Sequence, residues 1–278
     1  GAIFTQSGHT RVLVNCPEWA MVLTSLHGDI GSLFPVSGVT SEDLSVSAPA
    51  RQSGYDFNVF TAGTLIRIKG FGLAVKAFKI FSEIYPDSKL TIAGGGPEEH
   101  RLRRLISESR LEDKIELLGP IPRKDLMDRM ASSDVLLFPS LRDGGGTVVI
   151  EAMAAARPVI CLDAGGPGLH INESCGIKVD PKSPAETVLG LANALERLYL
   201  NDDLRERMGL AGRERARASY HWDKLGDRLM EIYQRILDAP VHADPGHAAD
   251  RAISVSSWMV QSLGCPSLGS GMSFRLET

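Results

Sequence analysis

A glycine-rich segment, Phe138–Thr147, has the residue types that point most directly to chemistry. It reads FPSLRDGGGT and stands between an apolar run and a stretch of helical periodicity that continues through Glu151. Three successive glycines let a ligand approach the main chain, and the free N–H groups at the start of a helix favour a negatively charged group. The segment therefore predicts a phosphate-binding site.

Two carboxylates flank this predicted site. Glu151 should lie about one and a half turns into the helix, or about 8 Å from its start, which is roughly the offset between a diphosphate and the ribose of one nucleotide. A carboxylate there can accept hydrogen bonds from both ribose hydroxyls. Asp143 precedes the helix and would face the other side of the diphosphate, where a sugar would sit. The alternative is a simple tight turn with Glu151 as a solvated helix residue.

Two further turns follow predicted strands. Gly63–Gly70 includes Lys69, whose charge could stabilise a leaving diphosphate, although a surface lysine is more often simply solvated. Gly94–Gly96 lies at the carboxyl end of a strand, where open α/β sheets bind ligands. It does not match G-x-G-x-x-G, because Glu99 stands at the third glycine position.

The composition of the chain and the motifs that it lacks disfavour several classes of function. The chain has 30 Lys and Arg against 34 Asp and Glu, and this balance argues against a nucleic-acid partner. The sequence contains no P-loop, H-E-x-x-H, G-x-S-x-G or Asp-x-Asp pattern. Catalysis by a bound metal or by a nucleophilic side chain is therefore disfavoured. The four cysteines are scattered, which favours reduced thiols, and we expect neither a membrane span nor a secretion signal.

The elements that must position these residues alternate between strand and helix from Tyr55 to about Leu237. Such alternation predicts an α/β fold, a doubly wound parallel sheet with at least five strands. The predicted strands are Asp56–Ala62, Leu90–Ala93, Ile115–Leu118, Val135–Phe138 and Pro158–Cys161. After Pro184 the pattern becomes nearly continuous helix, which we interpret as a closing helical cap.

The two ends of the chain have a different character. Residues 1–54 offer a strand at Val12–Val14 and a helix at Trp19–Leu26, but Gly, Ser and Pro dominate the rest. We interpret them as the remnant of another domain plus a linker. Residues 55–238 form the predicted sheet domain, and residues 239–278 have the composition of a disordered tail.

Together these segments resemble the donor half of the retaining glycosyltransferases of family 4, whose architecture of two Rossmann domains is called GT-B. Gly63–Gly70 corresponds to the family's G-R-L-x-x-x-K-G, and Ile92–Pro97 to its strand and glycine turn. Phe138–Glu151 corresponds to its F-P-S…E-x7-E block. Arg157–Ile160 and Gly165–Pro167 continue the match in order, so the resemblance covers about 180 residues. It implies a Rossmann-like donor domain.

The resemblance implies transfer of a sugar from a nucleotide-diphosphate sugar to an acceptor, with retention of anomeric configuration. Lys69 and Asp143 would be the catalytic residues: Lys69 meets the donor phosphates and Asp143 the transferred sugar. Glu151 would bind ribose, Ile121 would lie near the base, and the Gly144–Thr147 backbone would cradle the diphosphate. The expected donor-binding residues are Gly63, Thr64, Arg67, Gly95, Ile121, Ser140, Gly144, Gly145, Gly146, Thr147 and Glu151.

We expect no cofactor and no metal, because Lys69 and the helix amides would stabilise the diphosphate charge in place of a metal ion. The expected partners are a nucleotide sugar and an unknown acceptor, a glycan or lipid-linked glycan, and no nucleic acid. The Leu141–Pro167 region is similar to bacterial enzymes of surface-polysaccharide assembly, which is the pathway we expect. A cytoplasmic protein is expected, and a peripheral location at the inner face of the membrane stays open. A membrane-associated assembly or a complementing domain stays open as a further partner.

The chain departs from the family pattern in three places. Thr64 stands where the family has a phosphate-binding arginine, unless Arg67 reaches in, and Asp143 is one methylene shorter than the usual glutamate. Only Arg11–Val39 resembles the amino-terminal acceptor domain, so the helix from Trp222 would have little to brace and would leave apolar surface uncovered. A non-catalytic nucleotide-sugar module, or an inactive fragment that needs a partner, is the alternative function. A sugar-nucleotide epimerase is a third, which the F-P-S…E-x7-E block disfavours.

Overall fold

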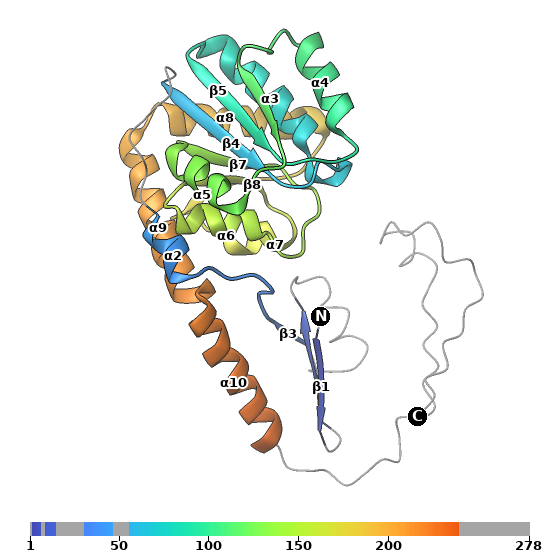
Figure 1. Cartoon of the computed structure of the whole chain (residues 1–278), viewed down its shortest axis with the longest axis vertical. Coiled ribbons are helices and arrows are strands. Elements are labelled where there is room, and N and C mark those ends of the chain that lie inside the picture. Colours follow the sequence, from blue (N-terminus) through green and yellow to red (C-terminus); the bar gives the residue numbers. More distant parts are fainter. Residues whose placement is uncertain (1, 7–8, 15–30, 47–55, 239–278) are drawn as a thin grey trace, which may run out of the picture. The chain divides into compact units, whose positions relative to one another are not determined.

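The computed structural model describes residues 2–6, 9–14, 31–46 and 56–238, all of which belong to one compact unit, Gly1–Ala239 (Figure 1). The strands are β1 (Ala2–Gln6), β2 (His9–Val14), β3 (Gly31–Leu33), β4 (Phe57–Ala62), β5 (Ser88–Ala93), β6 (Ile115–Gly119), β7 (Val135–Phe138), β8 (Val159–Leu162) and β9 (Gly176–Val179). The helices are α2 (Ser41–Ser45), the 3₁₀ turn η1 (Arg67–Lys69), α3 (Phe71–Ile84), α4 (Glu99–Glu108), α5 (Arg123–Ser132), α6 (Thr147–Ala154), α7 (Gly165–His170), α8 (Pro184–Tyr199), α9 (Asp202–Tyr220) and α10 (Trp222–Asp238).

The central sheet has six parallel strands in the order β6-β5-β4-β7-β8-β9. The chain runs outward from β4 to β6 on one side, then returns to β7 beside β4 and runs outward again on the other side. This order confirms the predicted α/β doubly wound sheet. It also makes the β4/β7 pair the point where the strand order reverses, and in open α/β sheets ligands bind outside the carboxyl ends of the strands at such a point.

Alternate residues of the strands face two separate cores. Phe57 and Val59 of β4 pack into the core that α3, α4 and α8 cover, whereas Phe60 and Ala62 pack on the opposite face, under α5, α6 and α9 (Figure 1). Side chains on a strand point alternately to the two faces, and a strand that is covered on both sides is apolar throughout. This explains why the strands appear in the sequence as short continuous apolar runs.

All five predicted strands of the sheet domain are present, and β9 is a sixth. The helical cap after Pro184 is three helices rather than one. Ser183 begins α8 with a capping box, and the side chain of Asn201 caps α9 by accepting a hydrogen bond from the Leu204 amide. The predicted helix Trp19–Leu26 and the predicted disordered tail lie outside the described residues, and the boundary at residue 54 stays a prediction.

A second, smaller sheet has the order β1-β2-β3, and its central strand β2 confirms the expected strand at Val12–Val14. The chain between this sheet and α2 passes directly beside the start of α10. The Val39 amide donates to the Tyr220 carbonyl at 2.9 Å, and the Trp222 amide donates to the Val39 carbonyl at 3.1 Å. The chain therefore enters the larger sheet and leaves α9 at one place, joined by two backbone hydrogen bonds. His221 also packs there, with its Nε2 atom 3.0 Å from the Ser41 hydroxyl.

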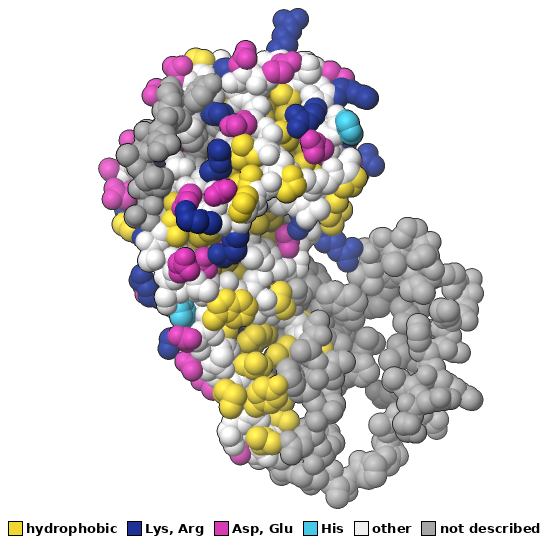
Figure 2. Space-filling model, in the orientation of Figure 1, with side chains coloured by type: hydrophobic (Ala, Val, Ile, Leu, Met, Phe, Trp, Pro, Cys, Tyr) yellow, Lys and Arg dark blue, Asp and Glu magenta, His cyan; other side chains and the backbone are white. Residues whose placement is uncertain are grey.

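Helix α10 has an exposed hydrophobic surface. Trp222, Met230 and Leu237 are 49%, 65% and 55% exposed, and Figure 2 shows hydrophobic side chains gathered along this helix. The same helix reaches the small sheet, because the Arg228 guanidinium donates to the Leu33 carbonyl at 2.8 Å. The expected uncovered apolar surface is therefore present on the described part of the chain.

Other sequence expectations concern thiols and membranes. Cys161 and Cys175 are buried and free, whereas the other two cysteines lie outside the described residues. In the described ranges, no helix combines the length and hydrophobicity that crossing a bilayer requires. Helix α4 also carries an exposed basic face, on which Arg101 and Arg103 pair with Glu98 and Glu99.

Candidate functional site

Lys69 and Asp143 meet at the carboxyl ends of β4 and β7, where the strand order reverses. Lys69 ends η1 after β4, Asp143 follows β7, and the Lys69 ammonium donates a hydrogen bond to Asp143 Oδ2. The two loops are pressed together at Gly70, which has a positive φ of 71°, and a Cβ atom there would lie 2.0 Å from the Pro139 carbonyl oxygen. The fold thus brings together the two residues that the sequence marked as catalytic.

The Asp143 carboxylate also occupies the glycine-rich start of α6. The amides of Gly145 and Gly146 donate to Asp143 Oδ1 at 3.0 and 2.9 Å. Burial works to raise the pKa of this carboxyl, but the hydrogen bonds from Lys69 and Gly146 outweigh it, and the pKa lies below its usual value. Positive charge thus converges at the predicted phosphate-binding segment, where it is met by the carboxylate of Asp143. Phosphate binding there stays a prediction.

His170, at the end of α7, stabilises the glycine loop through a hydrogen bond to its backbone. Its Nε2 atom lies 2.9 Å from the Gly145 carbonyl oxygen and its Nδ1 atom 3.0 Å from the Tyr220 hydroxyl. A carbonyl oxygen only accepts, so Nε2 carries the proton. Burial lowers the pKa of His170, which favours the neutral ring with the Tyr220 hydroxyl donating to Nδ1. The loop conformation is therefore fixed by a buried ring in one tautomer.

Glu151 is buried on α6, and only 6% of it is exposed. Its Oε1 atom accepts a hydrogen bond from Arg123 at 3.0 Å. Burial raises the pKa of the Glu151 carboxyl and the Arg123 charge offsets only part of this effect. The interpretation of Glu151 as a solvated helix residue is therefore wrong. A buried carboxylate with one engaged oxygen is suited to receive further hydrogen-bond donors.

The two turns on the β4 and β5 side interlock through their backbones. The Gly63 amide donates to the Ala93 carbonyl and the Leu65 amide to the Gly95 carbonyl, both at 3.0 Å. Thr64 is exposed in this turn. Arg67 lines a surface groove with Lys76 and Lys182, and within the described residues it makes no ion pair with Asp143. The expectation that Arg67 reaches in to replace the missing arginine therefore gains no support.

The remaining predicted residues surround the same loop. Ser140 is buried, and Thr147 Oγ1 lies 2.6 Å from the hydroxyl of Ser37, which precedes α2. Ile121 is half-buried at the carboxyl end of β6 and packs against the core under α6. In the described ranges, no group of three or more His, Cys, Asp or Glu side chains could hold a metal ion. That donor binding needs no metal stays a prediction.

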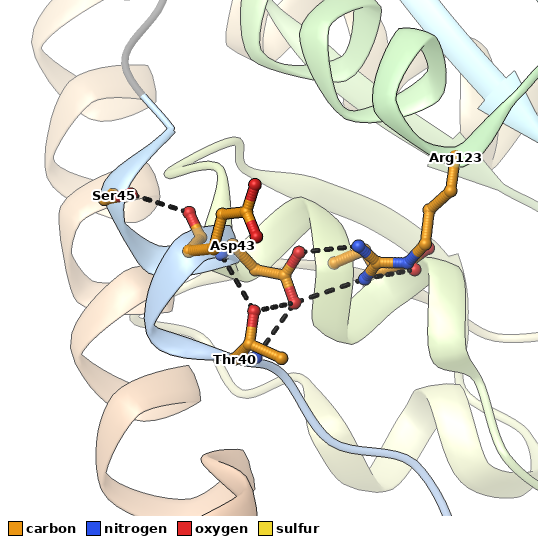
Figure 3. A network of polar contacts seen from close by, with 6 residues as sticks. Thr40, Asp43, Ser45 and Arg123 are labelled. Carbon is orange, nitrogen blue, oxygen red and sulfur yellow. Dashed lines mark hydrogen bonds and ion pairs between the residues drawn. The ribbon is translucent and has the colours of Figure 1, made fainter.

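Sequence reasoning missed three side chains that support the site: Arg123, Asp43 and His170. Arg123 contacts the carboxylates of both Asp43 and Glu151, and Figure 3 shows its contact with Asp43. A signal for Asp43 was present, because T-x-x-D at Thr40–Asp43 is a helix-capping pattern. Nothing in the amino-acid sequence shows that this short helix lies beside α6.

Comparison with known proteins identifies the family. Residues 50–215, more than half of the chain, match the family described as Glycosyl transferases group 1. The chain belongs to this family. The match spans β4 to most of α9, so the Lys69–Asp143 pair and Glu151 all lie within the matched region.

Relatives of this chain include D-inositol 3-phosphate glycosyltransferase of Pseudarthrobacter chlorophenolicus, which is 30% identical over 250 residues. That alignment covers 84% of this chain and 58% of the relative. A GDP-mannose-dependent monoacylated alpha-(1-6)-phosphatidylinositol monomannoside mannosyltransferase of Corynebacterium glutamicum is also 30% identical, over 177 residues, with 61% of this chain and 45% of the relative covered. The chain thus spans about half the length of these relatives.

Among solved structures, sucrose-phosphate synthase from Thermosynechococcus elongatus is similar in fold, with a TM-score of 0.69 and 26% sequence identity. The superposition covers 82% of this chain and 59% of the synthase. The parallel sheet with its flanking helices is therefore a Rossmann-like α/β domain of the kind found in GT-B glycosyltransferases.

Proposed function

We propose that this chain is the donor-binding half of a retaining family 4 glycosyltransferase, which transfers a sugar from a nucleotide-diphosphate sugar. One observation carries the proposal: Lys69 and the amides of Gly145 and Gly146, just before α6, converge on a single anionic group, the Asp143 carboxylate. Positive charge and a helix amino-terminus directed at one point suit a diphosphate. The family membership and the position at the strand reversal support the same assignment.

The proposed chemistry assigns one task to each residue. Lys69 and the backbone of Gly144–Thr147 neutralise the charge that grows on the departing diphosphate. Asp143 meets the transferred sugar, and Glu151 accepts hydrogen bonds from the ribose hydroxyls. The acceptor attacks from the face that the diphosphate leaves, and the departing phosphate takes the acceptor's proton, which gives retention.

The proposed acceptor rests on the resemblance and on the relatives of the chain. We keep a glycan or lipid-linked glycan of surface-polysaccharide assembly, on the cytoplasmic side of the membrane, as the proposed acceptor and place. Inositol phosphates and phosphatidylinositol mannosides are a second acceptor class, favoured by the names of the relatives. The unpartnered apolar side chains of α10 favour a complementing domain or partner.

A non-catalytic nucleotide-sugar module is the second candidate function. Thr64 is exposed at the position where the family has an arginine, and Asp143 fills the anion site. Both features weaken donor binding relative to the family pattern.

The test is calorimetric titration of the 278-residue chain with UDP, GDP and ADP without metal, followed by hydrolysis and transfer assays with the matching nucleotide sugars. Binding of one nucleotide with transfer to an added acceptor supports the enzyme. Binding without turnover supports the module, and free epimerised nucleotide sugar would identify an epimerase. If none of the three nucleotides binds, the donor-site assignment is wrong.

A further inference from the structure

Arg123 joins two carboxylates that are far apart in the sequence. At the first turn of α5, its Nη1 and Nη2 atoms donate to Asp43 Oδ1 and Oδ2 at 2.7 and 3.2 Å (Figure 3). Nη2 also donates to Glu151 Oε1 at 3.0 Å. The bond to Asp43 is two-pronged, which fixes the plane of the guanidinium, and that plane in turn fixes the direction of the bond to Glu151.

Asp43 is a rigid anchor for this arrangement. Its side chain is only 4% exposed, and its Oδ2 atom accepts from the amide and the hydroxyl of Thr40 at 2.9 and 3.0 Å. The Thr40 hydroxyl in turn accepts from the Asp43 amide, which completes the capping box of α2. Burial alone would raise the pKa of this carboxyl, but the hydrogen bonds from Arg123 and Thr40 lower it overall. Asp43 is therefore an ionised group with a fixed orientation.

Glu151 needs such an anchor. Its carboxylate is buried, and Arg123 is its only hydrogen-bond donor within the described part of the chain. A free glutamate side chain has three rotatable bonds, and a buried charge without a partner is costly. Arg123 engages Oε1 and leaves Oε2 with no hydrogen bond from the described residues.

We propose that Arg123 is a positioning residue for nucleotide binding: anchored by Asp43, it holds the Glu151 carboxylate in the orientation that receives the ribose hydroxyls. The inference rests on the proposed donor site and adds a specific role for two residues outside it. It makes α2, which precedes the larger sheet in the chain, part of the machinery that recognises ribose.

The experiment compares a ribonucleotide with an analogue that has no ribose hydroxyls. Calorimetry gives the Kd of the best-binding diphosphate among UDP, GDP and ADP and of its 2′,3′-dideoxy analogue, for the wild type and for Arg123→Gln. Loss of the Arg123 bond should weaken ribonucleotide binding at least tenfold and dideoxy binding less than threefold. Asp43→Asn should act in the same direction, and combining it with Arg123→Gln should add little.

Lys124→Gln is the matched control, because Lys124 neighbours Arg123 on α5 but pairs with Asp128 on the solvent side. It should leave both Kd values within twofold of the wild type. Should Arg123→Gln not fold by circular dichroism, Arg123→Lys keeps the charge without the two-pronged geometry, and a ribose-specific loss is again expected.

The failures of the two proposals are distinguishable. Equal weakening of both ligands in Arg123→Gln would mean general loosening, and unchanged ribonucleotide binding would mean no role; either result overturns the positioning role alone. Wild-type protein that binds the ribonucleotide and the dideoxy analogue equally would instead remove Glu151 from the ribose site, and the proposed donor geometry would fall with it.

Discussion

Replacing Asp143 by asparagine should make the chain bind nucleoside diphosphates more tightly. The wild-type carboxylate competes with the incoming phosphate for Lys69 and for the amides of Gly145 and Gly146. Asparagine has the same shape and keeps an oxygen that the amides can reach, but it carries no charge. The loop should therefore hold its conformation while the competition from the charged group disappears.

The magnitude follows from charge and burial. The Lys69 and Asp143 side chains are 20% and 13% exposed, so an effective dielectric constant of about 20 is appropriate. A phosphate bound to Lys69 would lie about 6 Å from the carboxylate, and two like unit charges at that separation repel by about 2.8 kcal/mol. Residual solvent and salt reduce this to about 1.4 kcal/mol, which corresponds to a tenfold gain in affinity.

Calorimetry at about 0.1 M salt measures this gain with the best-binding nucleotide. Asp128→Asn is the control, because it removes the same charge from an exposed ion pair on α5 and should leave the Kd within twofold. In the proposed function Asp143 also meets the sugar, so sugar transfer should fall even though the nucleotide binds more tightly. Unchanged or weaker nucleotide binding by Asp143→Asn would refute the view that this carboxylate occupies the phosphate site.

Three further predictions concern single side chains. Glu151→Ala should weaken nucleoside diphosphate binding by about 1.5 to 3 kcal/mol through loss of charged hydrogen bonds to ribose; unchanged calorimetric affinity for UDP, GDP and ADP alike would reject the assignment. Lys69→Ala should weaken diphosphates far more than the corresponding nucleosides, and an equal effect on both would place Lys69 outside the phosphate pocket. The pKa of His170 lies below the 6.5 of an unfolded chain, so its contribution to stability is complete above about pH 6.5 and falls as the pH drops toward the lower folded value. Denaturant unfolding should show this slope, at most about 1.4 kcal/mol per pH unit, and His170→Gln should flatten it; the same slope in both proteins would contradict the buried neutral ring.

Much of the fold was predictable because the strands of a doubly covered sheet are distinctive in sequence. Val135–Phe138 is buried on both faces, and the continuous apolar run marks its ends without ambiguity. Strand β9 was harder to predict, because Lys178 interrupts it and is exposed at the edge of the sheet. The break between α8 and α9 depends on the cap at Asn201, a local signal inside an otherwise helical pattern.

The candidate site was predictable where one short segment holds both the ligand-binding backbone and its flanking carboxylates. Asp143 and Glu151 lie in such a segment, and Lys69 contacts Asp143 because β4 and β7 are neighbours. The Asp43–Arg123–Glu151 contacts join α2, α5 and α6, and no periodicity in the sequence reports a contact between three separate elements. The occupation of the glycine loop by Asp143 is likewise a property of side-chain geometry, which the sequence does not encode locally.

The two backbone hydrogen bonds at Val39 have a mechanical consequence. The chain passes between the small sheet and the larger one at Val39, and again between α9 and α10 at His221. Because two backbone hydrogen bonds join these two segments side by side, they act as a single hinge. Gly38 tightens this hinge, since a Cβ atom there would lie 2.8 Å from the Tyr220 carbonyl oxygen and 2.9 Å from the Trp222 ring. A swing of the preceding residues about Val39 would leave these two backbone bonds in place but break the hydrogen bond between Ser37 and Thr147. Because α2 and its Asp43 begin directly after that hinge, they stay with the sheet while the part before it turns.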